Sequence, residues 1–99
     1  MSKMKLQILT SAENDIAVIV DYIARDKKTA AQKLLKDFYK SFDRLAHYPY
    51  MGSKKSDFTY QDVRFWVVKK NYLVIYKIVE DVIYILRVLP AYQDICALL

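Results

Sequence analysis

Lysine, arginine and tyrosine are the residues of this sequence that could act chemically on an anionic substrate. The 99 residues include 16 Lys and Arg and 9 Tyr, but only one His, one Cys and one Gly. Cationic side chains stabilise the charge that develops on a phosphodiester during cleavage, and a tyrosine or lysine can transfer the proton. Any catalysis by this chain would therefore be metal-independent chemistry on a phosphodiester.

Other catalytic motifs and cofactor-binding motifs are absent from the sequence. A phosphate-binding loop needs several glycines, and HExxH, CxxC and the nucleophile elbow do not occur. His47 is the only histidine and Cys96 the only cysteine, so no metal-ligand pair exists in the His and Cys inventory. We therefore expect no metal and no cofactor.

The net charge of +5 indicates an anionic partner, which could be nucleic acid, an acidic protein or a nucleoprotein assembly. One basic stripe on a predicted helix consists of Lys33, Lys36, Lys40 and Arg44. We interpret this stripe as a solvated outer face that Asp37 and Asp43 partly balance, with phosphate contact as the alternative. The pair Lys54-Lys55, in a predicted loop, is a candidate contact to nucleic acid or to another target.

Length and composition predict a single domain over residues 1–99. The chain is 55% hydrophobic and 27% charged, which is typical of a globular protein. It has no apolar run near the roughly 20 residues that span a bilayer, and no signal peptide at its start. We therefore expect a cytoplasmic protein without a membrane partner.

Two helices are expected after a short N-terminal strand. Residues 3–10 alternate polar and apolar side chains, as a half-buried strand does. Apolar residues then recur with a 3.6-residue period over residues 12–24 and 29–46, on either side of a charged turn. Thr10 and Glu13 have the spacing of a capping box at the start of the first helix. Because the turn is short, the helices should pack as an antiparallel hairpin.

The stretch from Val63 to Leu89 is predicted to form a three-stranded antiparallel meander. Its three runs are rich in β-branched and aromatic residues, with breaks only at Lys70-Asn71 and Glu80-Asp81. The expected fold class is therefore α+β, with an N-terminal strand, an antiparallel helix hairpin and a three-stranded antiparallel meander. The polar segment 53–62 would be the loop that connects the helices to the sheet.

Two-residue hairpin loops would set the register of the meander. The predicted pairs are Val79 with Val82, Lys77 with Tyr84, Lys69 with Tyr72 and Arg64 with Lys77. The face that should pack on the helices then consists of Val63, Phe65, Val67, Tyr72, Val74, Tyr76, Ile78, Ile83, Ile85 and Leu89, with Arg87 as its one inner charge. The opposite face consists of Arg64, Trp66, Val68, Leu73, Ile75, Lys77, Tyr84, Leu86 and Val88.

This opposite face is too apolar to be left in water and too basic for an ordinary core, so we interpret it as a docking surface. Cover by the C-terminal segment of the chain itself is the alternative.

Short motifs along the chain add a family resemblance. They are Arg44–Gly52 (RLAHYPYMG), Val63-Arg64, Asn71–Tyr76 (NYLVIY), Ile85–Leu89 (ILRVL) and Asp94. Together with the order of the elements, they resemble the RelE/ParE superfamily of bacterial toxins from type II toxin–antitoxin systems. The resemblance covers nearly the whole chain and implies the fold of that superfamily and a toxin function.

The resemblance implies two classes of target. RelE-like members are ribosome-dependent mRNA endonucleases, whereas ParE-like members inhibit DNA gyrase without known nuclease activity. If this chain is a ribonuclease, the implied catalytic residues are Arg64, Arg87 and Tyr92. Leu73 and Gln93 stand where the nucleases carry arginine, and Pro90 stands where histidine is common. We therefore expect a gyrase inhibitor, with a ribonuclease as the alternative and an inactive toxin remnant as the second alternative.

The resemblance also implies a cognate acidic antitoxin that forms a hetero-oligomer with the toxin. Type II antitoxins typically wrap a C-terminal segment over their toxin, and the docking surface described above would suit such a segment. The implied antitoxin-binding residues are Arg64, Trp66, Leu73, Ile75, Lys77, Tyr84 and Leu86. Lys54 and Lys55 remain candidate contacts to gyrase, or to the ribosome and mRNA.

Overall fold

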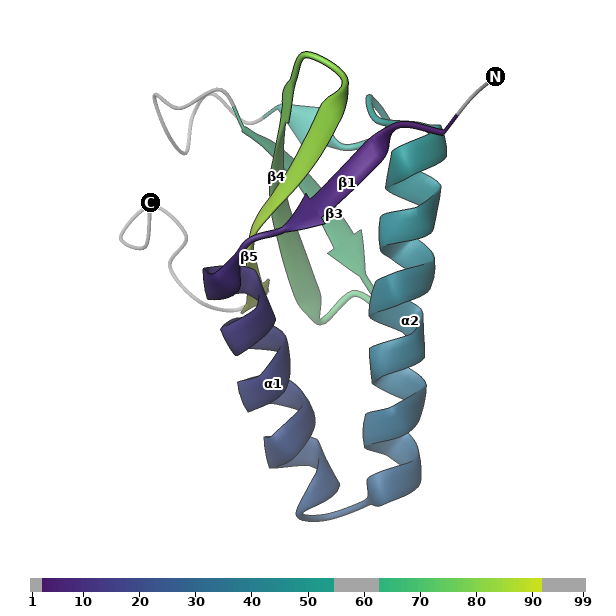
Figure 1. The fold of residues 1–99 in the computed structure, drawn as a ribbon. Helices are drawn as coiled ribbons and strands as arrows, with labels where there is room; N and C mark the ends of the chain where they lie inside the picture. Colours follow the sequence, from purple (N-terminus) through teal and green to yellow (C-terminus); the bar gives the residue numbers. More distant parts are fainter. Residues whose placement is uncertain (1–2, 55–62, 92–99) are drawn as a thin grey trace.

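A computed structural model describes residues 3–54 and 63–91 of the chain as two helices on one side of a mixed sheet (Figure 1). In chain order the elements are β1 (Lys5–Ile8), α1 (Thr10–Ala24), α2 (Lys28–His47), β2 (Ser53–Lys54), β3 (Arg64–Val68), β4 (Tyr72–Val79) and β5 (Val82–Pro90). The strand order is β1-β5-β4-β3-β2; β1 runs parallel to β5 and the other neighbours are antiparallel. The predicted α+β class, the helix hairpin and the meander are confirmed.

The helices begin and end close to the predicted residues. The charged turn separates α1 from α2, and α2 ends just before Pro49. The predicted capping box is wrong, because the N-cap position is Leu9 and no side chain of the described residues caps the helix. The hydroxyl of Ser11 instead donates to the carbonyl of Leu86 on β5, at 2.8 Å. No helix in residues 3–54 or 63–91 is long and apolar enough to cross a membrane.

The predicted register is correct for the second hairpin and wrong for the first. Val79 pairs with Val82 across a two-residue turn, as expected. The first turn has three residues, 69–71, so Val68 pairs with Tyr72 and Arg64 with Tyr76. Lys69 and Lys70 both have positive φ, of 53° and 64°. A shift of one residue turns every β3 side chain to the other face of the sheet.

A bulge in β5 shifts the end of that strand as well. Tyr76 pairs with Ile85 but Ile75 pairs with Arg87, which leaves Leu86 as an extra residue between the two pairs. Val88 therefore packs toward the helices and Leu89 toward the opposite face, the reverse of the prediction. The segment expected as a loop after α2 also contains β2, whose two residues pair with β3.

Two apolar clusters lie on the two faces of the sheet. The helix-side cluster joins α1 and α2 to the sheet through buried residues that include Ile16, Phe38, Leu45, Tyr76 and Ile85. The opposite-face cluster consists of Val63, Phe65, Leu73, Ile75 and Leu89, with Leu86 packed against it. The sheet therefore buries apolar side chains on both faces.

Candidate functional site

The segment after α2 is fixed to the sheet by the hydroxyl of Tyr76. This residue lies on β4, is 0% exposed, donates to the Pro49 carbonyl at 2.8 Å and accepts from the Gly52 N–H at 3.0 Å. Burial raises the pKa of the Tyr76 phenol, and the Gly52 N–H and the Arg64 charge oppose that rise in part. Pro49 and Gly52 belong to the motif that ends α2, so the structure gives a packing reason for that motif.

Gly52→Ala should destabilise the protein by about 2 kcal/mol, because there is no room for a methyl group at this position. A Cβ atom there would contact the Tyr76 hydroxyl and lie 2.7 Å from its ring carbon and 2.9 Å from the Phe65 carbonyl oxygen. Urea unfolding measures the change, with Ser53→Ala as the exposed neighbouring control. Equal stability of Gly52→Ala and the wild type would contradict this arrangement.

Arg64 reinforces the same segment from β3. Its Nη1 donates to the Gly52 carbonyl at 2.9 Å, and its guanidinium lies 5.0 Å from the centre of the exposed Tyr50 ring. The distance is within the range of a cation–π contact. Arg64 thus holds the end of the helix hairpin against the sheet.

Arg87 is held by α1 at the bulge of β5. Its Nε and Nη2 donate to the two carboxylate oxygens of Asp15 at 2.7 and 3.0 Å, and the Val88 N–H donates to the same carboxylate at 3.0 Å. The Asp15 hydrogen bond raises the pKa of Arg87. The hydroxyl of Ser11, one helical turn before Asp15, donates a hydrogen bond to the Leu86 carbonyl. Two side chains of α1 therefore satisfy the backbone groups around the bulge.

The candidate catalytic residues are not brought together among the described residues. Arg64 lies on β3 and Arg87 on β5, with β4 between them, and each has the structural contacts given above. Tyr92, Gln93 and Lys55 lie outside the described residues. Lys54 lies on β2 at the edge of the sheet with its side chain exposed. Residues 3–54 and 63–91 also contain no group of three or more His, Cys, Asp or Glu that could hold a metal ion.

The predicted antitoxin-binding residues do not share one surface. The predicted composition of the docking face is therefore wrong. Trp66 packs against the helix-side cluster, because the three-residue turn shifts the register by one residue and moves each β3 side chain to the other face of the sheet. Leu73 and Ile75 lie on the opposite face but are only 6% and 0% exposed. On that face Lys77 is exposed, and Tyr84 and Leu86 are half-buried. Whether individual residues of this set contact an antitoxin stays a prediction.

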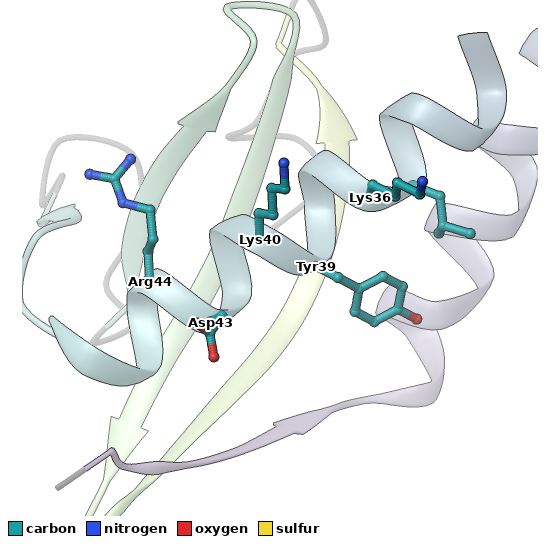
Figure 2. Close-up of a pocket in the computed structure, with 6 residues that line it drawn as sticks. Lys36, Tyr39, Lys40, Asp43 and Arg44 are labelled. Carbon is teal, nitrogen blue, oxygen red and sulfur yellow. The ribbon is translucent and has the colours of Figure 1, made fainter. Parts of the chain in front are cut away.

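A shallow groove of about 680 Å³ runs along the outer surface of α2. Its lining consists of two parallel rows of side chains, Lys36, Lys40 and Arg44 in one and Leu35, Tyr39 and Asp43 in the other. Figure 2 shows Lys40 and Arg44 extending from one side of the helix and Tyr39 and Asp43 from the other. Residues four apart on a helix lie along one face, so both rows can be recognised in the sequence from the spacing of their residues. Only the cationic row was predicted from the sequence.

The acidic residues of α2 do not balance its basic stripe, contrary to the prediction. Asp43 pairs with Lys3, which precedes β1, at 2.6 Å. The Lys3 ammonium, by its hydrogen bond, lowers the pKa of Asp43. Asp37 Oδ2 lies 2.9 Å from the ammonium of Lys69 in the β3–β4 turn, although the angles do not meet those of a hydrogen bond. Both carboxylates therefore interact with lysines from other elements.

A second groove, of about 460 Å³, lies between α1 and the start of β4. Its lining is mainly apolar and consists of Val18, Ile19, Tyr22, Ile23, Asn71, Tyr72 and Pro90. Val18 and Tyr22 are 69% and 74% exposed, which is unusual for side chains of their size. This groove contains no charged side chain among the residues that line it.

Comparison with known proteins gives a family match and a structural match. A family model described as "ParE toxin of type II toxin-antitoxin system, parDE" matches residues 6–95. A solved structure titled "Chromosomal ParDE TA system from P. aeruginosa" is similar to this chain with a TM-score of 0.75 and 20% sequence identity. The similarity covers 89% of this chain and 96% of the other. A search of curated proteins finds no match.

Proposed function

The chain belongs to the ParE family of toxins from type II toxin–antitoxin systems, and from this premise we propose that it inhibits DNA gyrase by binding and that a cognate antitoxin neutralises it. The family match covers residues 6–95, which is most of the chain. Inhibition by binding requires a surface complementary to the enzyme and no proton-transfer group. The alternative, cleavage of mRNA on the ribosome, requires catalytic cations at the scissile phosphate.

The engagement of both candidate catalytic arginines in structural contacts supports binding over cleavage. Two nitrogens of Arg87 donate to the carboxylate of Asp15, so much of its charge is already compensated. Arg64 donates to the Gly52 carbonyl and lies over the Tyr50 ring. A cation stabilises a transition state only if its donors can reach the charge that develops there. Neither arginine is arranged for that role.

The position of Leu73 gives further support. Leu73 stands where the resemblance places an arginine in the nucleases, and it is buried in the opposite-face cluster. A buried leucine cannot contact a substrate phosphate. Loss of one cationic group at such a site typically lowers the rate 100-fold or more. We therefore expect poor cleavage of RNA.

Two assays on the purified protein test the proposal. The protein at stoichiometric amounts should inhibit supercoiling by gyrase, and it should leave mRNA intact when added to translating ribosomes. Addition of the antitoxin should restore supercoiling.

Two results would contradict the proposal. Cleavage of mRNA in the ribosomal A site that disappears in Arg64→Ala or Tyr92→Phe would establish the ribonuclease. Thermal melts of both variants must show that they are folded. Inactivity of the wild type in both assays would instead indicate a toxin remnant.

A further inference from the structure

We propose that the groove along α2 is the docking site for an acidic segment of the antitoxin, with Tyr39 in contact with an apolar side chain of that segment. The inference rests on the proposed neutralisation by an antitoxin. It assigns the contact to the outer surface of the helix hairpin, not to the sheet face that the sequence indicated. Three observations carry it.

The first observation is that the cationic row has no counterion within the described part of the chain. Lys36, Lys40 and Arg44 have no carboxylate within 4.0 Å among residues 3–54 and 63–91, whereas Asp37 and Asp43 interact with Lys69 and Lys3. From Lys36 to Arg44 the row extends about 12 Å at 1.5 Å per residue. Three exposed cations in line create a local positive potential that attracts carboxylates.

The second observation is the apolar row beside these cations. Leu35 is half-buried, and Tyr39 is 50% exposed with its ring edge-on to Phe42 at a centroid distance of 5.7 Å. An exposed tyrosine beside a leucine offers apolar area to a partner, and tyrosine is enriched among the residues that dominate binding energy. A nucleic-acid backbone would leave this apolar row without a partner.

The third observation is that the surface continues toward β1. A neighbouring groove of about 360 Å³ shares Tyr39 and Asp43 with the first and adds Lys3 and Lys5. Both grooves have the volume of small-ligand sites, so they suit one peptide segment better than the surface of a large globular enzyme. A segment with carboxylates beside an apolar anchor therefore matches this site, and among the proposed partners the antitoxin can supply such a segment.

Charge reversal in the groove tests the site. The cognate antitoxin would be titrated calorimetrically into the wild type, Lys36→Glu/Lys40→Glu and Tyr39→Ala. We expect the double reversal to weaken binding on the order of 100-fold, and Tyr39→Ala to weaken it roughly 30-fold. The control is Lys27→Glu/Lys28→Glu, which changes the net charge equally at two exposed residues where the turn after α1 meets the start of α2. This control should bind within about threefold of the wild type.

Each outcome has a defined meaning. Equal weakening by the control would indicate a general charge effect and overturn the site, as would an unchanged affinity of the groove variants. Weakening by Tyr22→Ser alone would place the antitoxin in the second groove and also overturn it. Binding of a duplex DNA oligonucleotide to the wild type and to the control, but not to Lys36→Glu/Lys40→Glu, in competition with the antitoxin would assign the cations to nucleic acid instead.

Gyrase assays separate this inference from the proposed function. If both hold, Lys36→Glu/Lys40→Glu inhibits supercoiling like the wild type, but the antitoxin no longer relieves that inhibition. A wild type that binds antitoxin through the groove without inhibiting gyrase would overturn only the proposed target. A wild type that does not bind antitoxin would overturn both the neutralisation and the site.

Discussion

Tyr76→Ala should lower the free energy of unfolding by about 3–5 kcal/mol, the range measured for removal of large buried side chains. Tyr76 is completely buried at the centre of the sheet, and its ring belongs to the helix-side cluster. Truncation removes the ring and also leaves the Pro49 carbonyl and the Gly52 N–H without the partner that orders them. Urea or thermal unfolding, followed by circular dichroism, measures the loss.

Tyr76→Phe is the matched variant, because it keeps the ring and removes only the hydroxyl. We expect a loss of about 1–3 kcal/mol, since two backbone groups lose a hydrogen-bond partner at a site closed to water. A thermal melt of Tyr76→Ala that coincides with the wild type would show that Tyr76 does not occupy the core.

The raised pKa of Tyr76 adds a dependence on alkaline pH. The folded protein retains the phenol proton at a pH where the unfolded chain has lost it, so stability is complete below the unfolded value of about 10 and falls as the pH rises further. Tyr76→Phe should remove this part of the alkaline loss of stability.

The sequence predicts the elements better than it predicts how they pair. The apolar period of α1 and α2 and the charged turn between them locate both helices within a residue or two. The predicted register of the second hairpin is also correct, because its turn has two residues and Glu80 adopts the positive φ, of 55°, that such a turn requires. In these segments the local pattern agrees with the observed arrangement. Tyr76, Ile83 and Ile85 were therefore placed correctly in the core.

The first hairpin could not be predicted because β3 is apolar on both faces. Phe65 fits the opposite-face cluster as well as Trp66 fits the helix-side cluster. With no alternation to specify the register, the turn decides it, and two lysines in the left-handed region are hard to foresee. Every β3 side chain was consequently assigned to the wrong face. The predicted antitoxin-binding residues therefore lie on both faces of the sheet.

The candidate site on α2 depends on ion pairs that link distant parts of the chain. Asp43 is within one helical turn of Lys40 and Arg44, so the sequence favours local balance. The structure pairs Asp43 with Lys3, 40 residues earlier, and Asp37 with Lys69. Only the tertiary arrangement shows that Lys36, Lys40 and Arg44 have no carboxylate partner among the described residues. A search for basic stripes finds the row but cannot tell whether it is neutralised.

Asp15→Ala should lower the free energy of unfolding by about 3 kcal/mol, because it removes the acceptor for three hydrogen bonds at the bulge of β5. The Asp15 side chain is 15% exposed and that of Arg87 is 35% exposed. Water can therefore solvate part of the unpaired Arg87 guanidinium. The expected loss of stability is accordingly at the lower end of the range for breaking buried ion pairs. The Val88 N–H would lose its hydrogen bond to the Asp15 carboxylate. Chemical denaturation at neutral pH measures the change.

Asp21→Ala on the same helix is the control, since it removes the same charge from an exposed position and should change stability by no more than about 0.5 kcal/mol. Asp15→Asn should be intermediate, because the amide keeps one oxygen to accept from Arg87 but cannot accept with both atoms. Equal stability of Asp15→Ala and Asp21→Ala would mean that Arg87 is not committed to α1. Arg87 would then be available for an anionic substrate, and the ribonuclease alternative would regain its main cation.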